Sequence, residues 1–196
     1  MRLSIVAAMM GLLALSGCVT PVGPVEVTRF HLPDTSVLGK GTIAVEPASG
    51  QDGESMEFRS YAAAVERQLA TAGYSIVPGG NSGQVAQLKL DRQTWRPERR
   101  RGPVSVGVGG AAGSWGSGAG IGLGIDLSGP PPQQVETTMS VIIKDRTAGT
   151  RLWEGRASFT VRASSPLATT QLGAPKLAEA LFKDFPGQSG ETIQVP

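Results

Sequence analysis

The strongest constraint on how this chain can fold is a run of alternating residues between positions 133 and 163. In the first half, every second residue belongs to one mostly apolar set: Val135, Thr137, Met139, Val141 and Ile143. After a turn around Thr147-Ala148-Gly149, the same spacing returns with Trp153, Ala157, Phe159 and Val161. A period of two places each set on one face of a strand, and a short turn with glycine favours neighbouring antiparallel strands. The domain is therefore expected to contain a sheet with one buried face.

Shorter segments complete the predicted domain. Further strands are expected over residues 25–31, 42–46, 74–77 and 85–95. Between the second and third of these, apolar residues recur at helical spacing from Phe58 to Leu69, behind a cap at Ser55 and before Gly73. A second helix is expected to begin at about Pro175, because proline suits a first helical turn. Two helices packed on one face of an antiparallel sheet make a two-layer α+β fold.

The first eighteen residues have the layout of a signal peptide. Arg2 precedes an uncharged apolar run that ends at Leu15 and is shorter than the ~20 residues of a membrane span. The ending Leu15-Ser16-Gly17-Cys18 resembles the bacterial lipobox, in which a peptidase cuts before the cysteine and lipid is attached to its thiol. Cys18 is the only cysteine, so it cannot form an internal disulfide. We expect cleavage between Gly17 and Cys18 and acylation of Cys18, with palmitate among the acyl chains.

This interpretation divides the chain and implies a location. Residues 1–17 are the signal peptide, 18–24 the lipidated cysteine and tether, 25–187 the α+β domain, and 188–196 a C-terminal tail. Several acyl chains hold a protein stably on a membrane. The absence of aspartate after the cysteine favours the outer over the inner membrane, with the domain facing the periplasm.

Several short motifs resemble those of bacterial lipoproteins that carry domain of unknown function 4136. They are Gly41-Thr42-Ile43-Ala44-Val45-Glu46-Pro47, Gly73-Tyr74, Leu152-Trp153-Glu154-Gly155-Arg156-Ala157 and Asp184-Phe185-Pro186-Gly187. The resemblance covers about residues 25–187. It implies a helix that ends in Gly-Tyr, a Trp-Glu-Gly run on a late strand and a closing helix that leads into Phe-Pro. It supplies a fold and a location, and it assigns no catalytic residue.

Few residues are available for catalysis. His31 is the only histidine, and its expected role at the end of a strand is structural rather than catalytic. With Cys18 lipidated, the chain has too few nitrogen and sulfur donors for a zinc site. Asp52 and Glu54 could meet a hard cation, but a turn before a helix explains these acidic residues more simply. We expect a protein that is not an enzyme and has no metal or cofactor.

Glycines are concentrated in residues 102–129, where branched aliphatic residues alternate with glycine and serine. The aliphatic set is Val104, Val106, Val108, Ile121, Leu123 and Ile125, and Trp115 lies between the two halves. A nucleotide-binding loop needs a helix after the glycines, whereas both halves here alternate as strands. The segment is therefore expected to be a hairpin insertion with one aliphatic and one bare face.

Three roles are open for this hairpin. It extends the sheet of its own domain, it forms a surface for self-association or an envelope protein partner, or it dips into a membrane as in the curli-secretion channel lipoproteins. A bare face permits close approach of another backbone, which favours self-association or a partner. The alternating arms are at or below the ~9–11 residues that a membrane-spanning strand needs, which counts against the membrane role. The aliphatic set and Trp115 form the candidate interaction surface.

An arginine run precedes the glycine-rich segment and includes Arg92, Arg96, Arg99, Arg100 and Arg101. A solvated strand end and loop is the simpler interpretation. The alternative is that Arg96, Arg99, Arg100 and Arg101 contact phosphates of lipid or lipopolysaccharide, since arginine binds phosphate bidentately. Nucleic acid is not an expected partner, because the predicted location is the envelope.

The sequence as a whole predicts a lipid-anchored binding or scaffolding protein of the outer membrane. One competing function is an oligomeric, membrane-inserting or transport-auxiliary component that uses the glycine-rich hairpin. The other is an envelope hydrolase of an unrecognised type.

Overall fold

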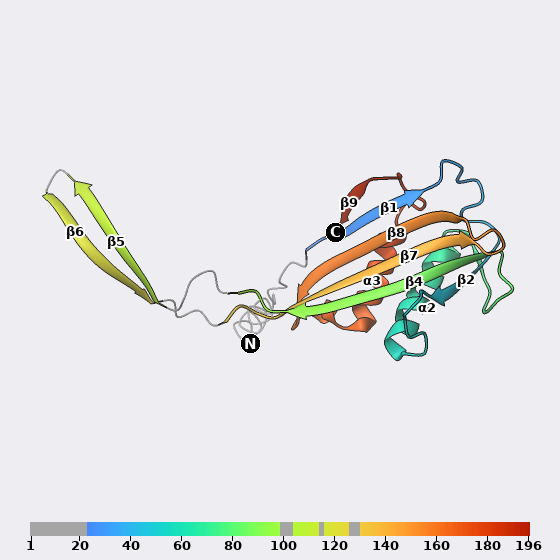
Figure 1. The fold of residues 1–196 in the computed structure, drawn as a ribbon, viewed down its shortest axis with the longest axis horizontal. Coiled ribbons are helices and arrows are strands. Elements are labelled where there is room, and N and C mark those ends of the chain that lie inside the picture. The colour runs from blue at the N-terminus through green and yellow to red at the C-terminus, as the bar shows by residue number, and fades with distance from the viewer. Residues whose placement is uncertain (1–22, 99–103, 114–115, 126–129) are drawn as a thin grey trace, which may run out of the picture.

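The computed structural model describes residues 23–98, 104–113, 116–125 and 130–196 (Figure 1). Seven strands form the main sheet, in the order β3-β2-β4-β7-β8-β1-β9. The strands are β1 (Val25–His31), β2 (Thr42–Pro47), β3 (Ser75–Ile76), β4 (Gln84–Trp95), β7 (Gln134–Asp145), β8 (Arg151–Arg162) and β9 (Thr192–Val195). Helices α2 (Met56–Thr71) and α3 (Thr170–Phe182) lie on the same side of this sheet (Figure 1). The fold is α+β, as the sequence predicted.

The predicted β7–β8 pair is confirmed and lies near the centre of the sheet. The two strands pair antiparallel, with Val135 opposite Val161 and Met139 opposite Ala157. The odd-numbered residues from Val135 to Ile143 and from Trp153 to Val161 are buried. Trp153 and Phe159 of β8 face the helices, and Tyr61 of α2 faces the sheet. Each of the three side chains is less than 5% exposed. One face of the sheet therefore forms the core with α2 and α3.

The sheet is mixed, which corrects the prediction that it is antiparallel throughout. Strand β2 runs parallel to both β3 and β4. The helix α2 follows β2 and carries the chain back across the sheet, so the strands after it run in the same direction as β2. The remaining pairs of the main sheet are antiparallel.

Helix α2 begins and ends as the sequence predicted. The side chain of Ser55 accepts a hydrogen bond of 3.1 Å from the backbone N–H of Phe58, which satisfies one of the free donors of the first turn. Gly73 follows the helix with a φ of +106°. A Cβ at Gly73 would stand 2.5 Å from the carbonyl oxygen of Gly39. Both the backbone angle and the close approach favour glycine there.

Helix α3 begins at Thr170, five residues before the predicted start, and Pro175 lies inside it. A 3₁₀ turn, η2 (Pro166–Ala168), precedes the helix, and the N–H of Gly173 donates to the Thr169 carbonyl at 2.9 Å. Pro175 cannot donate to the carbonyl of Gln171, so the helix lacks one hydrogen bond near its N-terminus. Burial of Leu177, Leu181 and other apolar residues on one face of α3 stabilises the longer helix.

The predicted tail, residues 188–196, contains strand β9. This strand pairs with β1, with Val25 opposite Val195 and Val27 opposite Ile193. Only four residues of β9 alternate, which is too short a pattern to distinguish a strand from a tail. The free edge of β1 supplies the partner that makes this segment a strand.

Two further strands, β5 (Val104–Gly113) and β6 (Gly116–Ile125), pair antiparallel in a separate two-stranded sheet. Their register places Val104 opposite Ile125 and Gly107 opposite Gly122. They come between β4 and β7 in the chain (Figure 1). In the part of the chain that the structure describes, no helix is long and apolar enough to cross a membrane.

Candidate functional site

The face of the main sheet opposite to the helices is open and polar. On β7, the even-numbered residues from Gln134 to Lys144 point to this face and are all partly or fully exposed. Among them are Glu136, Thr138 and Ser140. The central strands therefore present the core on one face and polar side chains to solvent on the other.

Strand register arranges these polar residues in rows across β4, β7 and β8. Ser140 lies opposite Lys89 on one side and opposite Arg156 on the other. Adjacent strands are about 4.8 Å apart, so this row holds one cation on each side of a serine. In the next row Asp91 lies opposite Thr138, and in the one after it Gln93 lies opposite Glu136.

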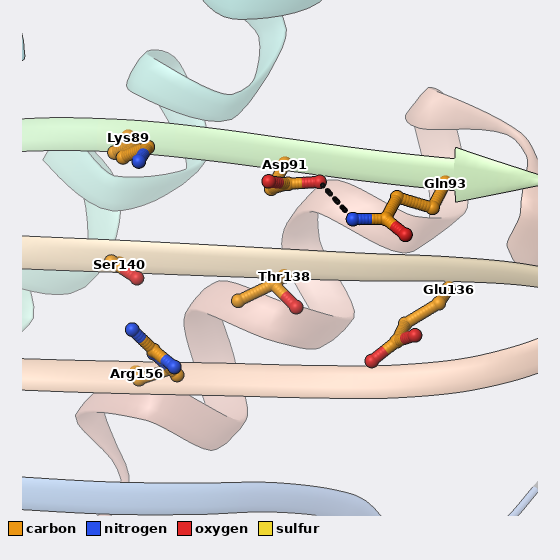
Figure 2. A pocket seen from close by; sticks show the side chains of 7 residues that line it. All are labelled: Lys89, Asp91, Gln93, Glu136, Thr138, Ser140 and Arg156. Atoms are coloured by element: carbon orange, nitrogen blue, oxygen red, sulfur yellow. Dashed lines mark hydrogen bonds between the residues drawn. The ribbon is translucent and has the colours of Figure 1, made fainter.

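A shallow hollow of about 170 Å³ opens over these rows, lined by Lys89, Asp91, Gln93, Glu136, Thr138, Ser140 and Arg156 (Figure 2). Lys89 and Arg156 flank Ser140 at one end of the view, Asp91 and Thr138 lie in the middle, and Gln93 and Glu136 lie at the other end (Figure 2). The hollow thus changes from cationic at one end to acidic at the other, where Glu136 lies.

The four charged side chains of the hollow are not used in ion pairs within the described part of the chain. The pairs found there are Arg92–Glu57, Arg146–Glu46 and Arg151–Glu154. The Asp91 carboxylate accepts a hydrogen bond of 3.3 Å from the Gln93 side-chain amide. Lys89 and Arg156 are exposed, so their charges are accessible to a ligand.

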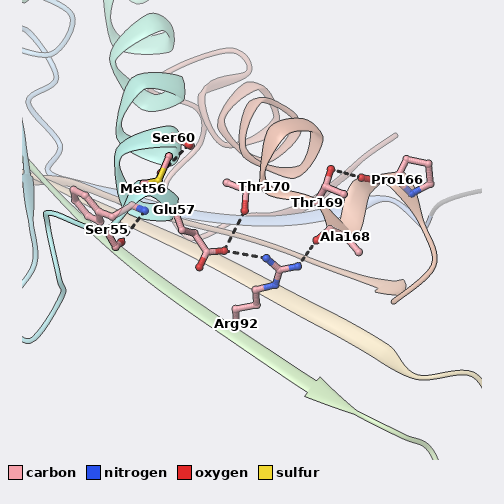
Figure 3. A network of polar contacts seen from close by, with 10 residues as sticks. Ser55, Met56, Glu57, Ser60, Arg92, Pro166, Ala168, Thr169 and Thr170 are labelled. Carbon is pink, nitrogen blue, oxygen red and sulfur yellow. Dashed lines mark hydrogen bonds and ion pairs between the residues drawn. The ribbon is translucent and has the colours of Figure 1, made fainter.

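Arg92 joins the sheet to both helices on the other face (Figure 3). Its Nη1 donates to Oε1 of Glu57 at 2.9 Å, and its Nη2 donates to the carbonyl of Ala168. The same Glu57 oxygen accepts a hydrogen bond from the Thr170 hydroxyl at 3.2 Å. Arg92 was predicted to belong to a solvated strand end and loop or to a phosphate contact, and the structure places it near the end of β4 with its guanidinium paired to Glu57.

A second hollow of about 150 Å³ lies beside this junction, and Tyr61 and Thr137 are among its lining residues. Burial raises the pKa of the Tyr61 phenol, and the positive charge of Arg92 opposes part of that increase. The phenol is therefore neutral at physiological pH. The arrangement fixes the first turns of α2 and α3 against β4, and we assign it a structural role.

The motifs that carried the family resemblance meet in the core. The Trp153 ring lies over Gly155, two residues along the same strand, so that a Cβ at Gly155 would stand 2.2 Å from the ring. The ring stacks on Phe182 with centroids 5.4 Å apart and also contacts Phe185 at 5.3 Å. Its Nε1 donates to the Pro186 carbonyl at 2.9 Å. The Trp-Glu-Gly and Phe-Pro-Gly motifs are thus two halves of one packing unit.

Arg29 completes this unit from β1. It is 4% exposed, its Nε donates to the Leu181 carbonyl and its Nη2 donates to the Ala180 carbonyl, each at 3.0 Å. These carbonyls lie at the C-terminus of α3, where a cation satisfies acceptors left free by the helix and interacts favourably with its dipole. Burial lowers the pKa of Arg29, and the charges of Asp184 and Glu191 oppose this effect.

His31 is held by backbone carbonyls. Its Nδ1 lies 2.7 Å from the Leu32 oxygen and its Nε2 lies 3.3 Å from the Gly187 oxygen. Asp52 accepts a hydrogen bond from the N–H of Glu54 at 3.0 Å, which makes the turn before α2. No group of three or more histidine, cysteine, aspartate or glutamate residues suited to a metal occurs among the residues described.

The predicted site residues fall into three groups. Arg96 is exposed just beyond the end of β4. The aliphatic set from Val104 to Ile125 lies on β5 and β6. The remaining predicted residues, Gly17, Cys18, Arg99, Arg100, Arg101 and Trp115, lie outside the described residues.

The fold is thus a two-layer α+β domain. The motifs that contain Trp153 and Phe185 lie in its core, and the other face of its sheet is open and polar. The chain belongs to the family described as Domain of unknown function (DUF4136), which it matches over residues 27–187. It is 27% identical to an uncharacterized protein of Zymomonas mobilis, in an alignment that covers 88% of this chain and 80% of that protein.

Solved structures provide likenesses of fold at low identity. A PDZ domain protein from Parabacteroides distasonis has a TM-score of 0.50 at 10% identity, over 97% of this chain. This chain spans only 42% of that protein. The PelC dodecamer from Paraburkholderia phytofirmans and a single-substitution variant of it each have a TM-score of 0.40 at 12% identity, over 80% and 78% of this chain and 97% and 92% of the PelC chain.

Sequence reasoning missed the hollow. Lys89, Asp91 and Glu136 alternate with apolar residues on predicted strands, so the pattern gives the face on which they lie. The pairing of β4 with β7 and of β7 with β8 brings them together with Arg156, and that register depends on contacts across the whole sheet. Alternating polar positions on neighbouring long strands were the available signal.

Gly155→Ala should destabilise the domain by about 3 kcal/mol, because the new methyl group overlaps the Trp153 ring and also stands 2.8 Å from Leu181. Chemical denaturation measures this loss. Gly83→Ala is the matched control, since a Cβ there meets nothing closer than 3.7 Å, and its effect should stay within about 0.5 kcal/mol. Equal stabilities of the two variants would contradict the packing described for Trp153.

Proposed function

We propose that this chain is a lipid-anchored binding protein of the bacterial envelope, and that its ligand binds on the open face of the main sheet. The observation that supports this proposal is the hollow over β4, β7 and β8, with its unpaired charges. A sheet face that only has to be soluble does not need a row in which two cations, Lys89 and Arg156, flank a serine. The surrounding strands are fixed by the core beneath them, so the charges are held on a rigid support.

The chemistry of the hollow favours a small polar ligand that carries an oxyanion. Lys89 and Arg156 donate charge-assisted hydrogen bonds, and the Ser140 hydroxyl adds a donor between them. At 170 Å³ the hollow is smaller than the ~300–1,000 Å³ of sites for drug-sized molecules. A phosphate, sulfate or carboxylate group fits the cationic end, and an ammonium or hydroxyl group fits Asp91 and Glu136.

Binding is favoured over catalysis by the surroundings of the hydroxyl groups. Ser140 and Thr138 lie in the middle of strands, where each faces polar or charged neighbours on the adjacent strands. The only histidine, His31, is occupied by the carbonyls of Leu32 and Gly187. An activated nucleophile needs a base within hydrogen-bonding reach and a third group that orients that base.

Inorganic phosphate is the simplest probe of the hollow. We expect it to shift the backbone amide signals around Ser140, with a dissociation constant on the order of 1 mM. Lys89→Gln combined with Arg156→Gln should weaken this binding about tenfold, because both charge-assisted hydrogen bonds are lost. Lys144→Gln, on the same face of β7, is the matched control and should leave the affinity unchanged. An affinity that is the same in both variants would remove the hollow as an oxyanion site.

The proposed anchor is Cys18, at the end of the lipobox-like run. Six residues, 19–24, separate Cys18 from Val25 at the start of β1, and the seven Cα–Cα steps between them span at most about 25 Å. An acylated Cys18 would therefore hold the domain close to the membrane surface. An outer-membrane location with the domain in the periplasm is part of this proposal.

Cys18→Ser should abolish incorporation of labelled palmitate and leave the precursor uncut, because the thiol that accepts the lipid is gone. Metabolic labelling followed by gel electrophoresis of the full chain measures both effects. Ser16→Ala keeps the thiol and should be labelled like the unchanged chain. Continued labelling of the Cys18→Ser chain would rule out the lipid anchor.

A second candidate function is self-association through the glycine-rich hairpin insertion, and the register of β5 and β6 favours it. Aliphatic positions lie opposite aliphatic ones, as with Val106 and Leu123, and glycines lie opposite glycines, as with Gly107 and Gly122. No third strand pairs with this ribbon among the described residues. An isolated two-stranded ribbon is marginally stable in water, and its free edges can pair with another chain.

Replacing Gly107, Gly109, Gly122 and Gly124 with threonine tests this second candidate. Threonine favours strands, so the ribbon itself should persist while its bare face becomes too bulky for close approach of another backbone. We expect loss of oligomers in sedimentation analysis, with the main domain still folded. Ser105→Thr, which adds a single methyl group on the same face, is the control. An unchanged oligomeric state in the fourfold variant would make this segment a spacer.

A further inference from the structure

Four chain segments converge at one end of the main sheet. Strand β4 ends there at Trp95, β7 begins there at Gln134, and these two residues are paired. Strand β8 ends there at Arg162, opposite Gln134. Strand β1 begins three residues short of this end, because the register aligns Glu26 with Ser158. The segment with the proposed anchor and the insertion between β4 and β7 therefore both leave the domain at this end (Figure 1).

The side chains at this end combine an aromatic ring with arginines. Trp95 is 46% exposed on the open face of the sheet. Arg96 and Arg162 are exposed beside it, and neither forms an ion pair in the described part of the chain. From Arg92 to Arg101 the sequence contains five arginines and one acidic residue, Glu98. An exposed tryptophan and unpaired arginines are the residues that bilayer interfaces and lipid phosphates bind.

We propose that this end of the sheet, defined by Trp95, Arg96 and Arg162, is a membrane-contact surface whose partner is the phosphate-bearing face of a phospholipid bilayer. The inference rests on the proposed anchor at Cys18. The anchor holds the domain within about 25 Å of the bilayer, and the arginines and Trp95 orient it there. Arg96 and Arg162 bind lipid phosphates, and the Trp95 ring lies at the level of the headgroups.

The opposite end of the sheet fits this partner less well. Two arginines there, Arg146 and Arg151, are paired with Glu46 and Glu154. Exposed apolar side chains such as Phe30 and Leu32 occur on that side, but no exposed tryptophan lies there among the described residues. Strand β7 spans twelve residues between the two ends, about 40 Å. The distance of each end from the bilayer therefore differs greatly between a domain that contacts the bilayer with one end and a domain that contacts it with the other.

The test uses the full chain with its lipid, reconstituted into vesicles of phosphatidylethanolamine and phosphatidylglycerol. Nitroxide labels are placed on Gln133→Cys, beside the start of β7, and on Ala148→Cys, in the turn between β7 and β8; both positions are exposed. We expect the label at 133 to collide several-fold less with a water-soluble nickel complex than the label at 148. A variant with Trp95→Ser, Arg96→Gln and Arg162→Gln should remove that difference, whereas Arg151→Gln should preserve it.

Flotation of the vesicles separates failure of the anchor from failure of this inference. A chain that does not float with the vesicles contradicts the lipid anchor, and a chain that floats is then judged by the labels alone. Equal accessibility of the two labels, or greater protection at 148, would overturn the membrane-contact surface. A difference that persists in the triple variant would overturn the assignment to these three residues.

Discussion

The buried guanidinium of Arg29 is the interaction on which the arrangement of this domain depends. It occupies a core position on β1, and it hydrogen-bonds the last carbonyls of α3. A buried charge is costly unless donors and acceptors match, so the end of α3 and the turn after it must stay in one place. A Cβ at Gly187 would stand 2.6 Å from Nη1 of this guanidinium. The Trp153 indole donates a hydrogen bond to the Pro186 carbonyl. The Trp-Glu-Gly and Phe-Pro-Gly motifs thus share one task, which is to fix α3 on the sheet.

Much of this fold could be predicted from local patterns. The alternation around Met139 and Phe159 gave two central strands and their buried face, and Ser55 with Gly73 gave the limits of α2. Features that depend on distant parts of the chain could not be predicted in this way. The parallel pairing of β2 follows from where α2 returns the chain, and β9 is a strand because β1 has a free edge. Helix α3 begins before Pro175 because burial of its apolar face outweighs one missing hydrogen bond.

Less of the candidate site than of the fold could be predicted from local patterns. The sequence places Lys89 and Ser140 on exposed faces of their strands, but their meeting with Arg156 also depends on the register between β4 and β7, which are separated by the insertion. The role of Arg92 could not be read from its neighbours either, because Glu57 and Ala168 reach it from two different helices. The run of arginines therefore contains Arg92, which is paired with Glu57, and Arg96, which is exposed just beyond the end of β4.

The position of β1 also determines how the domain responds to mechanical load. This strand lies between β8 and β9 and is antiparallel to both, and the chain that precedes it leaves at Val25. A pull on that chain acts along the strand, so it loads the hydrogen bonds on both sides of β1 together, in shear, rather than opening them one at a time. The pairing of Val195 with Val25 adds β9 to this support. A domain tethered at this point resists extraction through the strength of its sheet.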